Sequence, residues 1–380
     1  MIYLDNSATT KPYKEALDTY RIVSEQFFAN PSSLHKLGGQ SEALLSRSRE
    51  KAASLLGVDD HEIVFTSGGT EGNNLAIKGA AIAYRQRGRH LITTSIEHVS
   101  SLNAFKQLEQ LGFEVTYLPV DREGRVSFED FKRAYRKDTI LVSVMHVNNE
   151  VGTVQPVREI AEFLKTKPTT VFHVDNVQGF AKIPLHLKNS GIDLCTISGH
   201  KFHGPKGTGI LYVRSGTLLS PLFSGGVQEN QRRAGTENLP GICGMVRALR
   251  ITREHENSGI QHLSALQKQL RAGLSEIDGA VIHTPLKGAA PHIMNVSLSG
   301  IKSEVLVHAL EEDDIYVSTK SACSSRDTEA SGVLLSMCVP EDEAKQAIRI
   351  STAFETTSEE IDTFLRALKR HVQQLKIVMR

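Results

Sequence analysis

Short apolar segments alternate with helix-length stretches over the first two thirds of this 380-residue chain. Strand-like runs lie at 61–66, 90–95, 113–118, 139–146, 169–175, 194–198 and 209–213, and helical patterns lie at 11–28, 41–56, 71–83, 100–111 and 157–165. Because strands that alternate with helices pack as a mostly parallel sheet covered by helices, this pattern predicts an α/β domain. The β-branched runs at 140–144 and 171–174 are typical of strands buried on both faces.

The last third of the chain has a different character. A long polar helix is predicted at 258–277, and short strands and two further helices follow it. We therefore expect a large domain over 14–257 and a smaller α+β domain built from 1–13 and 258–380. The smaller domain also carries a polar loop at about 318–333.

Charge and apolar patterning exclude several classes of protein. Lys plus Arg number 44 and Asp plus Glu number 43, so the balance of +1 indicates neither a direct nucleic-acid contact nor a membrane surface. No apolar run is long enough to span a bilayer, and the start MIYLDNSATT does not resemble a signal peptide. The four cysteines form no C-x-x-C pair, so we expect free thiols, no metal site and a cytoplasmic protein.

Lys201 lies in a polar, glycine-bearing turn, Ser198 to Gly207, directly after a predicted strand. Taken alone, a lysine in such a turn is usually a solvated surface residue. Three other strand ends change this interpretation. The glycine-rich turn at 67–74 offers a helix N-terminus and the Thr70 hydroxyl to a phosphate, Asp175 ends an apolar strand, and His98 follows another.

Each of these three segments also has an ordinary structural explanation, as a capped turn, a helix N-cap or a structural histidine. Together they suit one cofactor, pyridoxal 5′-phosphate, which needs a lysine for its Schiff base, an acid against its ring nitrogen and a phosphate site. Lys201, Asp175 and Thr70 supply these three groups. The glycine-rich turn is neither a P-loop nor G-x-G-x-x-G, which disfavours a nucleotide.

The chain resembles the cysteine desulfurases, the NifS/IscS-like group of the class V aminotransferase family. The resemblance runs through nearly the whole chain and is carried by YLDNSATT (3–10), NPSSLH (30–35), TSGGTEGNN (66–74), EH (97–98), MHVNNEVGTVQP (145–156), HVDNVQ (173–178), SGHKFHGPKG (198–207), GGVQENQRRAGTEN (225–238), SACSS (321–325) and IRIS (348–351). It implies a fold-type I pyridoxal-phosphate enzyme whose large domain holds a mostly parallel seven-stranded sheet, and it implies a homodimer.

The resemblance also implies roles for the matched residues. Lys201 carries the cofactor, His98 stacks on the cofactor ring and relays protons, and Asp175 pairs with the ring nitrogen. Asn149 and Gln178 lie near the ring hydroxyl. The phosphate is bound by Gly69, Thr70, Ser198 and His200, and across the dimer interface by Thr236. Arg349, with Asn149, binds the substrate carboxylate, since a guanidinium grips a carboxylate through two parallel hydrogen bonds. Without the family, Arg349 is equally well explained as half of a surface ion pair.

Cys323 matches the sulfur-accepting cysteine of the family. It lies in SACSSRDTEASG, whose small and polar residues predict a mobile surface loop. Free cysteines are more often buried apolar residues, and we predict that environment for Cys195, Cys243 and Cys338. The position beside the cofactor acid, Asn176, departs from the family, which more often has a small residue there.

The implied reaction converts L-cysteine to L-alanine, with Lys201 removing the α-proton and the Cys323 thiolate taking the sulfur as a persulfide. The sulfur then passes to an acceptor protein, either an iron–sulfur scaffold or a thiolation enzyme for tRNA or a thiamine precursor. The C-terminal tail is shorter than in members that dock a scaffold through it, which leaves the acceptor open. The alternatives are a selenocysteine lyase, another class V aminotransferase-like enzyme and a non-catalytic scaffold.

Overall fold

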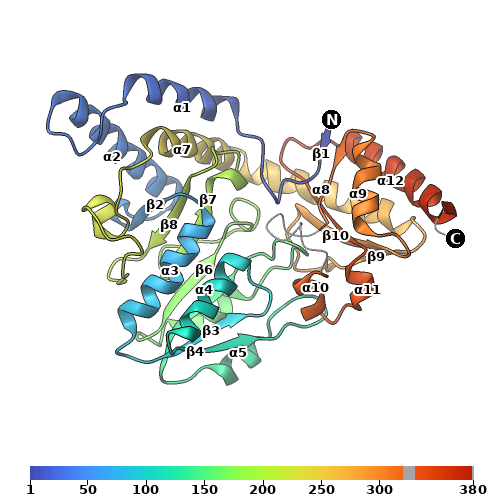
Figure 1. Ribbon diagram of the computed structural model, residues 1–380, viewed down its shortest axis with the longest axis horizontal. Coiled ribbons are helices and arrows are strands. Elements are labelled where there is room, and N and C mark those ends of the chain that lie inside the picture. Colours follow the sequence, from blue (N-terminus) through green and yellow to red (C-terminus); the bar gives the residue numbers. More distant parts are fainter. Residues whose placement is uncertain (320–329, 379–380) are drawn as a thin grey trace.

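A seven-stranded sheet forms the centre of the larger part of the molecule, seen here in a computed structural model that describes residues 1–319 and 330–378 (Figure 1). Its strand order is β2 (Ile63–Thr66), β8 (Gly209–Val213), β7 (Leu194–Ser198), β6 (Val171–Asp175), β5 (Thr139–Met145), β3 (His90–Thr94) and β4 (Glu114–Leu118). Strands β7, β6, β5, β3 and β4 are parallel, and β8 is antiparallel to both of its neighbours. The predicted mostly parallel seven-stranded sheet is thus confirmed.

Helices cover both faces of this sheet. Helices α3 (Gly69–Tyr84) and α4 (Val99–Gln110) pack on one face, and α1 (Lys14–Gln26), α2 (Lys36–Leu56), α5 (Phe128–Ala134), α6 (Val157–Leu164) and α7 (Leu239–Glu254) pack on the other. Successive strand residues point to opposite faces, so Leu91 joins the first core and Ile92 the second. Every residue of β5 and β6 is buried, as their β-branched runs predict.

The last third of the chain forms a second core. Strands β12 (Ala347–Ser351), β10 (Ile293–Leu298) and β9 (Ala280–Ile282) make an antiparallel sheet, packed with α8 (Glu256–Ser275), α9 (Ser303–Glu311) and α12 (Ser358–Val378), and the short helices α10 (Gly332–Ser336) and α11 (Glu341–Ala344) lie beside it. The N-terminal strand β1 (Ile2–Tyr3) pairs with β11 (Ile315–Tyr316), and Leu4 is buried in the same core. The N-terminal segment therefore packs with the C-terminal third (Figure 1).

Two sequence expectations differ from the structure. Helix α7 was not predicted, because its glycines and β-branched residues weaken the helical pattern; Asn238 caps it and Pro240 stands in its first turn. The prediction that Cys338 is buried is wrong: it follows α10 with φ +62° and is exposed. Cys195 and Cys243 are buried as expected, whereas Cys323 lies outside the described residues.

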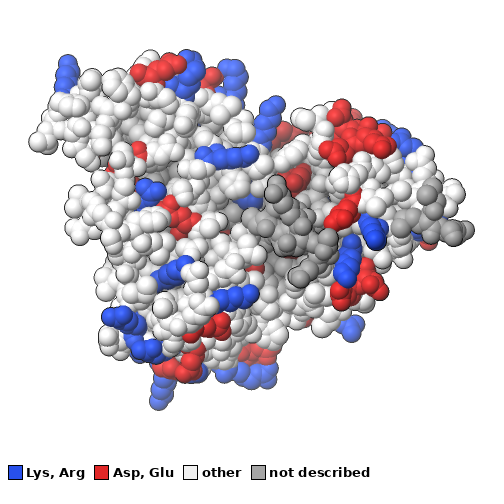
Figure 2. All heavy atoms as spheres, in the orientation of Figure 1, with Lys and Arg blue, Asp and Glu red and all other residues white. Residues whose placement is uncertain are grey.

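The surface fits the near-zero net charge. Figure 2 shows Lys and Arg side chains interspersed with Asp and Glu side chains over the visible face. Among the helices that the structure describes, none has the length and apolar character that a bilayer crossing demands. Within residues 1–319 and 330–378, no three His, Cys, Asp or Glu side chains gather into a metal-binding group.

Candidate active site

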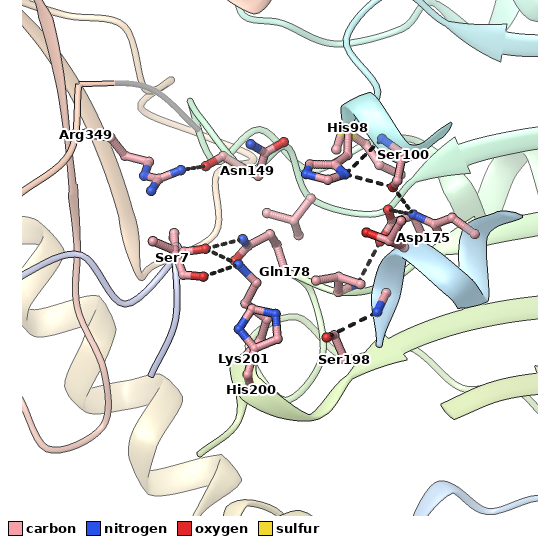
Figure 3. Close-up of a pocket in the computed structure, with 17 residues that line it drawn as sticks. Ser7, His98, Ser100, Asn149, Asp175, Gln178, Ser198, His200, Lys201 and Arg349 are labelled. Carbon is pink, nitrogen blue, oxygen red and sulfur yellow. Dashed lines mark hydrogen bonds between the residues drawn. The ribbon is translucent and has the colours of Figure 1, made fainter. Parts of the chain in front are cut away.

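A cavity of about 140 Å³ lies at the carboxyl edge of the parallel strands, where α/β sheets bind ligands. Its walls include residues from four strand ends, the N-terminal segment and the small core (Figure 3). Of the residues predicted from sequence, those that line it are Gly69, Thr70, His98, Asn149, Asp175, Gln178, Ser198, His200, Lys201 and Arg349. The structure therefore brings together positions separated by almost the whole chain.

Lys201 ends the short 3-10 helix η2 (Gly199–Lys201), which continues directly from β7. Its ammonium group donates hydrogen bonds to the backbone oxygens of Ser7 and Ala8, the latter at 2.8 Å. The Gln178 amide also donates to the Ser7 oxygen, at 3.0 Å. The N-terminal segment thus forms one wall of the cavity (Figure 3). The sequence alone did not predict this position for Ser7 and Ala8.

Asp175 is the last residue of β6 and is buried. One carboxylate oxygen accepts from the backbone N–H of Val177 at 3.0 Å, and the other accepts from the Asn73 amide at 2.7 Å. Asn73 lies in the first turns of α3. It lies within the TSGGTEGNN motif, but nothing in a single sequence indicates that its side chain reaches Asp175.

His98 is the N-cap of α4, and its ring lines the cavity. Its Nδ1 atom accepts from the Ser100 backbone N–H at 3.2 Å and lies 2.8 Å from the Ser100 hydroxyl. Burial lowers the pKa of His98 below its usual range; Asp175 opposes this effect and Lys201 adds to it. The side chain is therefore a neutral imidazole over most of the physiological range.

The N-terminus of α3 forms the opposite end of the cavity. Gly68 has φ +150°, a conformation that side chains disfavour, and a side chain at Gly69 would approach Val177 to 3.0 Å. The Gly69 backbone N–H donates to the Ser198 hydroxyl at 3.3 Å. Burial, followed by two nearby lysines, lowers the pKa of His200 to about 4, so this ring is neutral. The positive end of this 16-residue helix favours an anion here.

Arg349 lies in the middle of β12 and is only 1% exposed, between the fully buried Ile348 and Ile350. One guanidinium nitrogen donates to Asp5 at 2.8 Å and another to the Asn149 backbone oxygen at 3.0 Å. Among the described residues nothing accepts from the buried Nε atom. A surface ion pair is therefore excluded, and the buried arginine lies on the wall of the cavity.

The cavity wall does not include every predicted residue that the structure describes. Thr236 is exposed in the loop before α7 and is not part of the cavity wall. Cys323 lies outside the described residues. Asn176 turns away from the cavity, and its side-chain oxygen lies 2.8 Å from Nδ1 of the buried His146. Asn176, which replaces the small residue more common in the family, therefore contacts His146 and does not form part of the cavity surface.

Glu97 gives the site a testable pH dependence. Its carboxyl group is buried, and one oxygen accepts from the Thr94 hydroxyl and from the Met145 backbone N–H. Burial raises its pKa from 4.5 to about 8. The pKa of Glu97 is higher in the folded protein than in the unfolded chain, so protonation of this residue favours the folded state. The free energy of unfolding is therefore highest below pH 4.5 and falls as the pH rises towards 8.

Glu97→Gln is therefore expected to stabilise the protein relative to wild type by an amount that grows between pH 5 and 8, reaching on the order of a few kcal/mol. Urea unfolding at several pH values measures this difference. A difference that stays constant over that range would show that Glu97 is ionised in the folded protein.

Comparisons with known proteins agree with the geometry of the site. The sequence model of the family described as aminotransferase class-V matches residues 2–364. A NifS/IcsS protein homolog of Lactobacillus delbrueckii subsp. bulgaricus is 50% identical over 97% of this chain and 96% of its own, and a cysteine desulfurase IscS of Dictyoglomus turgidum is 42% identical over 99% and 96%.

A solved structure titled as a NifS-like protein superposes with a TM-score of 0.92 at 39% identity, and the match covers 98% of this chain and 99% of that one. Its similarity extends over both the large sheet and the small core described above. With a family match over nearly the full length and relatives above 40% identity, the chain belongs to the class-V aminotransferase family.

Proposed function

We propose that this chain is a pyridoxal-phosphate-dependent cysteine desulfurase, which converts L-cysteine to L-alanine and transfers the sulfur to Cys323. The observation that carries the proposal is the position of Arg349 on the same cavity as Lys201 and Asp175. A buried guanidinium on the wall of a cavity fits the carboxylate of an amino acid. The names of the relatives, which include cysteine desulfurases, support the same activity.

The residues present fit pyridoxal phosphate. The lysine amine lies at one side of the cavity, the buried Asp175 carboxylate at the back, and the N-terminus of α3 at the end. Lys201 would hold the aldehyde carbon as a Schiff base, and Asp175 would keep the ring nitrogen protonated by stabilising its positive charge. Gly69, Thr70, Ser198 and His200 would receive the phosphate, with Thr236 of a second subunit.

The bound cofactor supplies an electron sink for the negative charge that develops at the substrate α-carbon. Arg349 and Asn149 would bind and orient the substrate carboxylate, and this would direct the α-proton towards the Lys201 amine. Lys201 then takes that proton. The Cys323 thiolate attacks the substrate sulfur, so the carbon–sulfur bond breaks, a sulfur–sulfur bond forms on Cys323, and protonation of the remaining carbon skeleton releases alanine.

A protein acceptor and a second subunit complete the proposal. The persulfide on Cys323 would pass to an iron–sulfur scaffold or to a thiolation enzyme for tRNA or a thiamine precursor. The exposed position of Thr236, away from its own cavity, supports a homodimer in which that residue reaches the partner's site. Sedimentation is expected to show a dimer, and a fully active monomer would contradict this assembly.

Incubation of the cofactor-loaded protein with L-cysteine and a thiol reductant tests the activity. Alanine and sulfide are expected to form in equal amounts, at a rate proportional to enzyme concentration. An aminotransferase would instead consume the amino group and release a keto acid. Absence of alanine from the loaded wild-type protein would overturn the proposed function.

Arg349→Lys is expected to raise the KM for L-cysteine about tenfold or more, because the ammonium group cannot make the two parallel hydrogen bonds of the guanidinium. The matched control is Arg366→Lys, at an exposed position on α12. Steady-state kinetics checks both variants. Equal KM values for the two variants and wild type would remove Arg349 from the substrate site.

A further inference from the structure

Two hydrogen bonds determine which nitrogen of His98 carries its proton. The backbone N–H of Ser100 lies at the start of α4 and points at Nδ1 of His98, 3.2 Å away. A backbone N–H can only donate, so Nδ1 must present its lone pair. In a neutral imidazole the proton is then on Nε2. Because Nδ1 is turned to Ser100 and the ring lines the cavity, Nε2 is the nitrogen left for a ligand.

Asn73 links the Ser100 hydroxyl to Asp175. Its amide nitrogen donates to an Asp175 carboxylate oxygen at 2.7 Å. The same nitrogen lies 3.0 Å from the Ser100 hydroxyl and donates to it as well. Because Nδ1 of His98 presents its lone pair to the Ser100 N–H, the Ser100 hydroxyl, 2.8 Å from Nδ1, also donates to it, and its oxygen accepts from Asn73 (Figure 3).

We propose that Asn73 and Ser100 are positioning residues that couple Asp175 to His98, hold the imidazole as its Nε2–H tautomer and make it a hydrogen-bond donor to the cavity instead of a base. The functional part of this inference rests on the proposed desulfurase activity: with His98 as donor, Lys201 is the residue that removes the α-proton. The hydrogen-bond chain itself rests only on the four side chains and one backbone N–H.

The surroundings of the ring support a neutral imidazole. The positive end of α4 is directed at Nδ1, which disfavours a second proton on the ring. Burial lowers the pKa of His98, and the nearby Lys201 lowers it further. Asp175, at the end of β6, acts in the opposite direction, and Glu97, the residue before His98 in the chain, has its pKa raised to about 8 by burial. Burial, reinforced by Lys201, thus outweighs Asp175 and favours an uncharged His98 at neutral pH.

Nitrogen-15 NMR of protein labelled only at histidine reads the tautomer directly. The spectra are recorded between pH 6 and 9, without and with added pyridoxal phosphate, and a His98→Gln variant identifies the His98 signals. Wild-type protein is expected to show protonated Nε2 and unprotonated Nδ1 over this whole range. A proton on Nδ1, or an imidazolium at pH 7.5, would overturn the proposal.

Variants along the chain test the coupling. Ser100→Ala removes a donor that stabilises the neutral ring, so the pKa of His98 is expected to rise by up to about one pH unit. Asn73→Ala releases the Ser100 hydroxyl to turn away and is expected to shift the pKa in the same direction, which provides a second variant if the first does not fold. The matched control is Ser101→Ala, because the Ser101 hydroxyl is buried in the same turn and has no hydrogen-bond partner among the described residues.

An equal shift in the Ser101→Ala control, or no shift in either Ser100→Ala or Asn73→Ala, would contradict the coupling. The readout does not depend on turnover. Alanine formation with His98 protonated on Nδ1 would therefore overturn the hydrogen-bond chain and keep the proposed function. If His98 had the expected tautomer but the protein formed no alanine, the hydrogen-bond chain would stand and the proposed function would be overturned.

Discussion

Lys201→Ala is expected to reduce alanine formation from L-cysteine by at least about 10³-fold, because one side chain both holds the cofactor and removes the α-proton. The variant should also lack the visible absorbance of the lysine–cofactor Schiff base after incubation with pyridoxal phosphate. Alanine analysis and absorbance spectra measure the two effects separately.

The matched control for this variant is Lys206→Ala. Lys206 lies five residues further along the same glycine-bearing segment, but its side chain is exposed and does not line the cavity. It should keep both the absorbance and the turnover of wild type. If Lys201→Ala retained the Schiff-base absorbance, another lysine would carry the cofactor and the assignment of the whole cavity would be wrong.

Cys323→Ala is expected to lower sulfide release by at least about 100-fold while the Schiff-base absorbance stays at its wild-type level. The reason is that the reaction needs a nucleophilic thiolate for the substrate sulfur, whereas binding of the cofactor does not involve this residue. Sulfide assays and absorbance spectra on the same preparation separate the two outcomes.

Cys338 provides the control for this prediction, because it is the exposed thiol among the described cysteines. Cys338→Ala should release sulfide at the wild-type rate. If the two variants behaved in the opposite way, the sulfur acceptor would be Cys338. Sulfide release that is unaffected in both single variants would show that no thiol at either position is needed.

The overall architecture was predictable because strand and helix patterns alternate regularly. Strand β7 has the bounds expected from sequence, and the polar residue at its end, Ser198, lies at the cavity as expected. A helix such as α7 was harder to predict, because its stability comes from packing on α1 and α2 rather than from local propensity.

The outer parts of the site were not predictable from one sequence. Asn73 and Ser100 come from different helices, and only the packing of α3 against α4 brings them together at Asp175. The pairing of Asp5 with Arg349 joins residues at opposite ends of the chain. The presence of Asn, Ser or Asp in a sequence does not indicate such contacts, because all three residue types are common at turns and helix ends.

The N-terminal segment links the small core to the chemistry of the cavity. Leu4 anchors it in that core, and the next residues supply Asp5 to Arg349 and backbone oxygens to Lys201. The geometry of the amino-acid site therefore depends on how the small core is placed against the large sheet.

A single turnover without reductant tests the central claim most directly. The loaded protein is mixed with less than one equivalent of L-cysteine, alkylated, digested and analysed by mass spectrometry, and alanine is counted in the same sample. The account predicts one alanine for each added cysteine and an equal amount of persulfide on the peptide that contains Cys323. Alanine formed in full amount with the persulfide on another residue, or with none on the protein, would contradict it.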